Sequence, residues 1–244
     1  MGDSDGLAQV AQLGTILGVW AHPDDETYLS GGVMAAAVAQ GQRVVCVTAT
    51  RGEAGSLDEE RWPPARLAEI RTSELADAFA HLGLSEHHWL DYPDGGCAEV
   101  PEEEAALRLV ELMSTVRPST VLTFGPDGIT GHDDHVAVSR WVSRAVQMWV
   151  EAREPRPRVL QAAETIEWYA TVEDVFDSQE IYMGFEPPRI PRAQAAFLVT
   201  WSDPWLAAKV EAIREQVSQT SGMFERFGDE GMRRAIAEEA FVDG

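Results

Sequence analysis

The stretch TILGVWAHPDDE, residues 15–26, joins an apolar run to a polar cluster. The cluster places one imidazole, His22, and three carboxylates, Asp24, Asp25 and Glu26, within five positions. Two glycines and a segment of small residues follow it. This order is typical of a strand, an active-site loop and a helix. Because ligands of open α/β sheets bind just outside the carboxyl ends of the strands, the stretch predicts both the fold class and the place of the site.

A second polar cluster follows another apolar run and reads GPDGITGHDDH over residues 125–135. The carboxyl ends of parallel strands lie along one edge of a sheet, so we expect His22, Asp25 and His135 to converge. Two imidazoles and one carboxylate suit zinc, which in catalytic sites takes three protein ligands and keeps one position open for water. Nickel and ferrous iron accept the same ligand types, so the ligands alone do not select the metal.

The two clusters and the segments between them resemble the LmbE-like or PIG-L family of zinc-dependent N-deacetylases. The family signature Ala-His-Pro-Asp-Asp-Glu stands intact at residues 21–26, and the distal Gly-His-x-Asp-His stands at residues 131–135. The resemblance extends over about residues 15–150 of the chain. Intermediate blocks that resemble the family in the family's order are TATRGEAG at 48–55, RTSEL at 71–75, LG at 82–83 and YPDG at 92–95.

By this resemblance, His22, Asp25 and His135 are the expected zinc ligands. Asp24 is the expected general base, and His132 is expected to stabilise the oxyanion or to protonate the departing amine. The chemistry of these residue types agrees, because zinc lowers the pKa of a bound water to near neutrality and an adjacent carboxylate can take its proton. Asp24 and Asp25 are neighbours in the sequence, so they project differently and can divide the two tasks.

Four further residues complete the expected site. Asp134 is expected to hydrogen-bond an imidazole, which fixes its tautomer. Arg71 and Asp94 match family positions associated with sugar binding, where a guanidinium donates to hydroxyls and a carboxylate accepts from them. For Arg71 the alternative is a pair with Glu74 on a helix surface. Glu53 lies in a Gly-containing loop, where substrate binding and plain exposure to solvent are both open.

The carboxylates of the first cluster also have a structural alternative. Asp24 or Asp25 could cap the following helix, and Glu26 could serve the same helix N-terminus, because carboxylates are favoured there. Some histidines belong to no such cluster and are expected to be structural: His81, His87 and His88.

Three positions depart from the family pattern. Gln216 stands where many members carry His, Thr130 stands where some carry Tyr, and Asp133 stands where Pro is common and adds charge near the metal. None of these changes removes an expected ligand or the base. The later part of the chain also holds aromatic residues that are expected either to wall the pocket or to pack in the core, namely Trp168, Tyr169, Tyr182 and Phe185.

Composition limits the class of protein. At 244 residues the chain can bury a sizeable core and fits one domain, 1–244, better than two small ones. The formal net charge of −22 would repel nucleic acid and an anionic membrane surface, so neither is an expected partner. The N-terminus lacks the basic region of a signal peptide, which makes the cytoplasm the expected compartment. The expected partner is a small-molecule amino-sugar conjugate, and association into a homo-oligomer is left open.

The early part of the chain alternates strand and helix patterns, which indicates a Rossmann-like three-layer α/β sandwich with a mostly parallel central sheet. No Gly-x-Gly-x-x-Gly follows the first strand, so a dinucleotide cofactor is not expected. Residues 1–13 are expected to form a flexible N-terminus, and 158–244 a less regular part of the same domain with a helix over 203–224. The expected strands are 15–21, 43–50, 87–92, 119–124, 158–163 and 196–201, and the other expected helices are 27–40, 64–82, 101–116 and 134–150.

These observations predict a zinc-dependent hydrolase that removes an N-acyl group, in the first place acetyl, from an amino sugar or a glucosaminyl conjugate. An amidase acting on a thiol conjugate or an antibiotic is the alternative within enzymes. Outside enzymes, the alternative is a metal-binding module without turnover. Asp24 and His132 argue against such a module, because metal binding alone needs only the three ligands.

Overall fold

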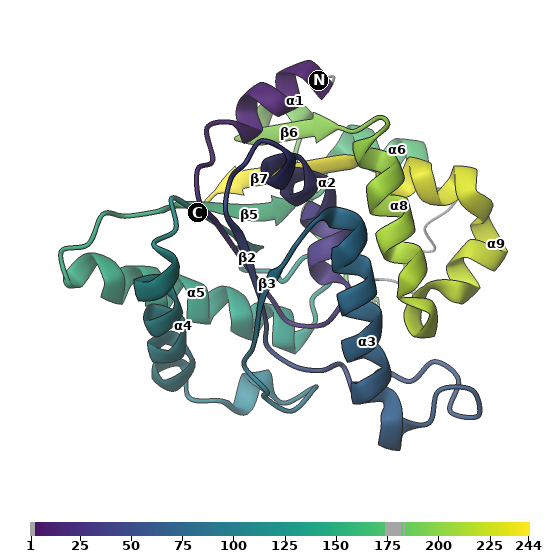
Figure 1. The fold of residues 1–244 in the computed structure, drawn as a ribbon, viewed down its shortest axis with the longest axis horizontal. Coiled ribbons are helices and arrows are strands. Elements are labelled where there is room, and N and C mark those ends of the chain that lie inside the picture. The colour runs from purple at the N-terminus through teal and green to yellow at the C-terminus, as the bar shows by residue number, and fades with distance from the viewer. Residues whose placement is uncertain (1–2, 174–181, 183) are drawn as a thin grey trace.

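A seven-stranded sheet with the order β3-β2-β1-β4-β5-β7-β6 forms the centre of the computed structural model (Figure 1). The structure describes residues 3–173, 182 and 184–244. Strands β1 to β5 pair in parallel, whereas β7 runs antiparallel to both β5 and β6. The strands are β1 (Ile16–Trp20), β2 (Val44–Thr48), β3 (Glu86–Trp89), β4 (Thr120–Phe124), β5 (Arg158–Ala163), β6 (Phe197–Thr200) and β7 (Glu238–Asp243).

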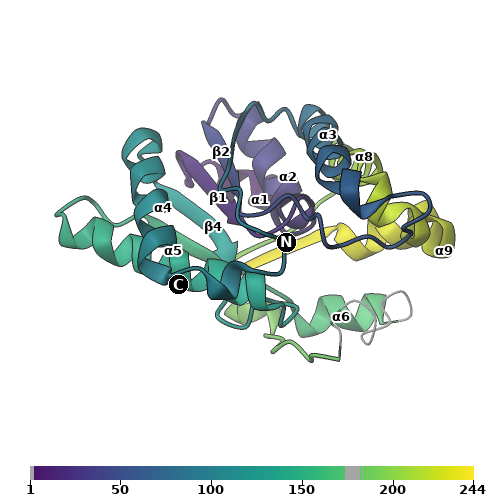
Figure 2. The ribbon, with the colours of Figure 1, turned by 90° about the horizontal axis from the view of Figure 1, so that it is seen from below.

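Helices cover both faces of this sheet (Figure 2). Helices α4 and α5 pack against each other, and α8 packs against both α2 and α3. Every residue of β1, β2 and β4 is buried, as expected for central strands of a parallel sheet that is covered on both faces. The helices are α1 (Asp3–Val10), α2 (Asp25–Ala39), α3 (Pro64–Leu82), α4 (Glu102–Val116), α5 (Asp133–Glu151), α6 (Ile166–Val172), α8 (Trp205–Glu215) and α9 (Val217–Ile236).

The predicted fold class is confirmed: the domain is a single α/β unit with a mostly parallel central sheet. The strands expected at 15–21, 43–50 and 119–124 correspond to β1, β2 and β4 within two residues at each end. Among the described helices, none is both long enough and apolar enough to cross a membrane.

The structure differs from the expectation at the N-terminus, where residues Asp3–Val10 form helix α1 instead of a flexible segment. Val10 is fully buried, and α1 contacts β6. Gln9 also donates from Nε2 to the carbonyl oxygen of Leu198 over 3.3 Å. A helix this short is marginal on its own, so its order comes from tertiary contacts that the local sequence does not show.

The C-terminal part is more regular than expected. The helix expected over 203–224 is two helices, because the backbone leaves the helical conformation at Gln216 between α8 and α9. Strand β7 has no counterpart in the sequence-based assignment. It pairs with β5 and β6 and so inserts the C-terminal residues between two earlier strands.

Candidate metal centre and active site

The ends of β1 and β4 place the two polar clusters next to each other. The strands are hydrogen-bonded neighbours in parallel register. His22 follows β1, and His135 lies in the first turn of α5, which follows β4. His22 Nδ1 is 3.1 Å from His135 Nε2. The Asp25 carboxylate lies 3.7 Å from His22 Nδ1 through Oδ2 and 3.4 Å from His135 Nε2 through Oδ1. The structure therefore brings the three expected ligands together.

These donor atoms fit a divalent transition metal. Ligands about 2.0–2.2 Å from a tetrahedral ion lie roughly 3.3–3.6 Å apart, which is close to the separations of His22, Asp25 and His135. All three residues are buried. Burial holds the pKa of His135 well below its usual range, so its imidazole is neutral and can act as a ligand. Donor atoms of His22, His132 and His135 also lie within 4.8 Å of one another, which keeps His132 close to the same point.

The second ring nitrogen of His22, Nε2, contacts two carboxylates. His22 Nε2 is 3.2 Å from Asp134 Oδ2 and 3.1 Å from Asp94 Oδ1. Burial lowers the pKa of His22, but hydrogen bonds to Asp134 and Asp94 outweigh burial and raise it to about 10. The same carboxylates stabilise positive charge at this point, as the surroundings of a metal ligand should. Asp134 is itself fixed, because Oδ2 and Oδ1 accept from the backbone N–H groups of Gly95 and Cys97 at 2.8 and 3.0 Å.

His135 is oriented from its own side of the site. Its Nδ1 lies 2.9 Å from the carbonyl oxygen of Gly128, and the Thr130 hydroxyl lies 3.1 Å from the same nitrogen. The ring stacks on Phe124, with the ring centres 4.2 Å apart. A proton on Nδ1, donated to Gly128, leaves Nε2 as the free lone pair that faces His22 and Asp25. Thr130, one of the departures from the family pattern, therefore contacts an expected ligand.

Asp24 has a backbone conformation that is rare for a residue other than glycine, with φ at 134°. Its side chain makes no capping hydrogen bond to α2, although the residue stands at the N-cap position. The side chain instead lies at the wall of a cavity beside Asp25 and His135. Burial raises the pKa of Asp24 to about 6, although Arg71 opposes this shift. Backbone strain of this kind is found at sites where a side chain must be held in one place.

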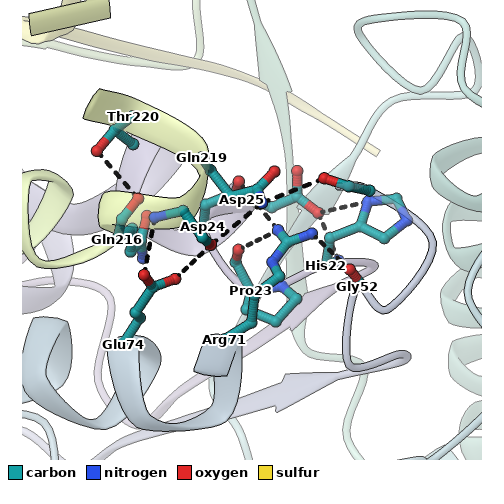
Figure 3. Close-up of polar contacts among 12 residues, drawn as sticks. His22, Pro23, Asp24, Asp25, Gly52, Arg71, Glu74, Gln216, Gln219 and Thr220 are labelled. Carbon is teal, nitrogen blue, oxygen red and sulfur yellow. Dashed lines mark hydrogen bonds and ion pairs between the residues drawn. The ribbon is translucent and has the colours of Figure 1, made fainter. Parts of the chain in front are cut away.

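Arg71 holds Asp24 in this position (Figure 3). Its Nη2 donates to the Pro23 carbonyl oxygen at 2.6 Å and to Asp24 Oδ2 at 3.1 Å. Its Nη1 donates to the carbonyl oxygen of Gly52 at 3.0 Å. A Cβ at Gly52 would overlap the guanidinium, and φ there is +66°, so this close approach requires glycine. Glu74, the alternative partner of Arg71, instead accepts hydrogen bonds from the backbone N–H and the hydroxyl of Ser218.

The other two expected substrate-binding residues also have partners within the protein. Asp94 contacts His22 through Oδ1 and accepts from the backbone N–H of Ala54 through Oδ2 at 2.8 Å. Glu53 Oε1 accepts from the backbone N–H of Asp94 at 3.0 Å. Burial raises the pKa of Asp94, but the hydrogen bond to His22, the charge of His22, the hydrogen bond from Ala54 and the charge of Arg71 together outweigh it and hold the pKa at about 2. Sugar binding by these residues stays a prediction, since their contacts connect them to the metal centre.

Glu26 and the departures from the family pattern surround this centre. Glu26 is fully buried and accepts a hydrogen bond from the Asp24 backbone N–H at 3.3 Å. Burial raises the pKa of Glu26 to about 8.

Two of the departures from the family pattern lie in different surroundings. Gln216 is buried and donates to the Thr27 hydroxyl at 3.3 Å. Asp133 is exposed at the start of α5, and an effect of its charge on the metal stays a prediction. The histidines expected to be structural have partners elsewhere, His87 with Thr48 and His81 with Glu215.

A cavity of about 280 Å³ opens from the metal centre. Asp24, Asp25 and His135 are among the residues that line it. The rest of the wall comes from α2, β5, α6, α9 and β7, which include segments that sequence reasoning did not connect with the site. Of the aromatic residues considered from sequence, Trp168 and Tyr182 line it. The small and apolar wall residues carry no motif, so nothing in the sequence marked them.

The sequence is similar to those of known proteins. Residues 17–146 match the family described as PIG-L: GlcNAc-PI de-N-acetylase. A 1D-myo-inositol 2-acetamido-2-deoxy-alpha-D-glucopyranoside deacetylase of Kineococcus radiotolerans is 38% identical over 168 residues, which cover 57% of this chain and 46% of that protein. A protein of the same description from Catenulispora acidiphila is 34% identical over 187 residues, covering 66% of this chain and 57% of that protein. The chain thus spans about half the length of these curated relatives.

Solved structures share the fold. The conserved protein TT1542 from Thermus thermophilus superposes with a TM-score of 0.62 at 30% identity, covering 95% of this chain and 94% of that one. The N,N'-diacetylchitobiose deacetylase of Pyrococcus horikoshii has a TM-score of 0.67 at 21% identity, covering 96% of this chain and 85% of that one. The family match covers more than half of the chain and both of its polar clusters, so the chain belongs to the family described as PIG-L: GlcNAc-PI de-N-acetylase.

Proposed function

We propose that this protein is a zinc-dependent hydrolase that removes an N-acyl group, in the first place acetyl, from an amino sugar or a glucosaminyl conjugate. The observation that carries the proposal is the position of Asp24: its carboxylate lies beside three converging ligand side chains and at the wall of the same cavity. The activities of the deacetylases named above support the amide bond as the target and the acetylated amino sugar as the substrate class.

His22, Asp25 and His135 would hold the metal. When bound, zinc supplies Lewis acidity, which polarises a carbonyl oxygen and lowers the pKa of a coordinated water. The protein's own contribution is to fix the ligands before the metal arrives. Asp134 and Gly128 do this from opposite sides, through His22 Nε2 and His135 Nδ1.

Asp24 takes the proton from the attacking water in this proposal. A general base works best when its pKa is near the working pH, and burial brings the pKa of Asp24 to about 6. Arg71 keeps the carboxylate aimed at the site and prevents burial from raising its pKa further. The base is thus both ionised at neutral pH and fixed in place.

His132 is placed to act on the other side of the scissile amide. Its Nδ1 accepts the backbone N–H of Asp134 at 3.1 Å and so caps α5. Because Nδ1 accepts this hydrogen bond, a neutral ring carries its proton on Nε2. Nε2 is then a hydrogen-bond donor directed away from the helix. Its ring centre lies 4.8 Å from that of His22. A donor here can stabilise the oxyanion of the tetrahedral intermediate, and the proton that Asp24 has taken from the water can pass to the departing amine.

The relatives named above support a bacterial source, and we place the reaction in the cytoplasm, on a small-molecule conjugate. The direct test is acetate release from N-acetylglucosamine and its inositol conjugate, measured on chelator-treated protein before and after one equivalent of zinc is restored. We expect release only after zinc is restored. Equal release by the metal-free protein, or none from either substrate by the zinc-loaded protein, would contradict the proposal.

A further inference from the structure

The cavity beside the metal centre has an apolar wall. Beyond Asp24, Asp25 and His135, residues from α2, α6 and α9 line it. Its volume of about 280 Å³ exceeds the roughly 150 Å³ that suffices for a benzene ring in a dry protein cavity. The apolar wall residues on which the argument rests are Leu29, Ile129, Ala163, Trp168, Met223 and Ile236.

The other carboxylates that line this cavity already have protein partners. Glu164 accepts from the Tyr182 hydroxyl and from Arg189 Nε, the latter at 3.0 Å. Glu238 accepts from Arg192 Nε at 2.8 Å. A carboxylate satisfied in this way offers little to the hydroxyl groups of a ligand. A hydroxyl-rich ring placed against these carboxylates would therefore lose hydrogen bonds to water that they do not replace.

The carboxylate of Glu239 also has hydrogen-bond partners within the protein. Both of its oxygens accept backbone N–H groups of α2, and Lys209 Nζ lies 2.7 Å from Oε1. No lysine or arginine is among the described residues that line the cavity. An anionic ligand would thus meet carboxylates without a lining cation, in a chain whose formal net charge is −22. The cavity therefore suits a group that is uncharged and apolar.

We propose that this cavity binds an uncharged apolar group of the substrate, so that the enzyme prefers substrates with such a group near the scissile amide over simple N-acetylglucosamine. The inference rests on the proposed function. Two parts of a substrate could supply the group: an N-acyl chain longer than acetyl, or an apolar aglycone. Both present the same chemistry to the wall, and each makes a different kinetic prediction.

The zinc-loaded enzyme is tested on two substrate series. In the first, the N-acyl chain of glucosamine is lengthened from acetyl to hexanoyl. In the second, the N-acetyl group is kept and the glycoside is changed from methyl to butyl to hexyl. We expect kcat/KM to rise about 3- to 4-fold per added methylene in one series until the cavity is filled. The series that rises identifies which part of the substrate enters the cavity.

Two variants test the cavity itself. Ala163→Leu fills it from β5, and Leu29→Ala enlarges it from α2. We expect Ala163→Leu to reduce the preference for the hexyl or hexanoyl substrate over its short counterpart at least 10-fold. Leu29→Ala should move the optimum to a longer chain. The matched control is Ala170→Leu at an exposed position on α6, which should keep the wild-type preference.

Calorimetry with methyl and hexyl glucoside, which lack the amide, separates this inference from the proposed function. Where the glycoside series is the one that rises, we expect the hexyl compound to bind at least 10-fold more tightly with a negative heat-capacity change, and Ala163→Leu to remove the difference. If acetate is released while both kinetic series stay flat, the inference is wrong and the proposed function stands. If no substrate is hydrolysed, the proposed function fails, and equal binding of the two glucosides would then reject an apolar aglycone as the occupant of the cavity.

Discussion

Arg71 Nη2 donates to Asp24 Oδ2 at 3.1 Å while the same guanidinium holds the Pro23 and Gly52 carbonyls. Because this contact aims the proposed base, Arg71→Ala should lower kcat about 10- to 100-fold and change KM little. The loss should be equal for a glycoside and for a simple N-acetyl amide that lacks hydroxyls. Steady-state kinetics on the two substrates provides the measurement.

The control for Arg71 is Arg66→Ala, which removes an exposed guanidinium from the same helix and should leave both constants near wild type. A different pattern would show that Arg71 binds the sugar instead. In that case KM for the glycoside would rise, and the simple amide would be hydrolysed as fast as by the wild type.

We assign His132 two separable tasks, since its Nδ1 caps α5 and the ring also lies next to His22 and His135. His132→Ala should lose about 1 kcal/mol of stability, which is roughly 2–4 °C in melting temperature, and about 3 kcal/mol of transition-state stabilisation. His132→Asn restores a capping side chain, so it should recover the melting temperature and leave kcat low. Bound zinc should stay near wild type in both variants. Loss of zinc from either one would make His132 a ligand instead.

Lys209, the only lysine in the sequence, forms a fully buried ion pair with Glu239. Lys209→Met leaves a buried carboxylate without its cation, so we expect a loss of about 3–5 kcal/mol in the free energy of unfolding. In a double-mutant cycle with Glu239→Gln, the second change should cost much less when Lys209 is already replaced. Urea denaturation of the four proteins measures this coupling. Additive losses would show that the two side chains act independently.

Much of the fold could be predicted because its signals are local. The strands β1, β2 and β4 are buried on both faces, so they appear in the sequence as continuous apolar runs. Strand β7 gives no such signal. Its segment carries two glutamates and an aspartate, and the buried Glu239 is neutralised by Lys209 from a distant helix. The break between α8 and α9 likewise depends on Gln216, whose buried side chain contacts Thr27 of α2.

Part of the candidate site could likewise be predicted from the sequence, and part could not. The convergence of His22, Asp25 and His135 follows from neighbouring parallel strands, which strand patterns can predict. The contacts of Arg71 cannot be predicted in this way, because they depend on the path of the backbone at Pro23 and Gly52. The wall of the cavity is made of ordinary apolar side chains from distant segments, and only the folded structure brings them together.

The division of labour between Asp24 and Asp25 tests the central claim most directly. Bound zinc and acetate release should be measured on the same preparations of wild type, Asp24→Asn and Asp25→Ala. The account predicts that Asp24→Asn keeps zinc near wild type and loses about 10²- to 10⁴-fold in kcat, because the base is removed and the ligands remain. Asp25→Ala should lose zinc and activity together. Loss of zinc from Asp24→Asn, with Asp25→Ala still metal-loaded and active, would contradict the account.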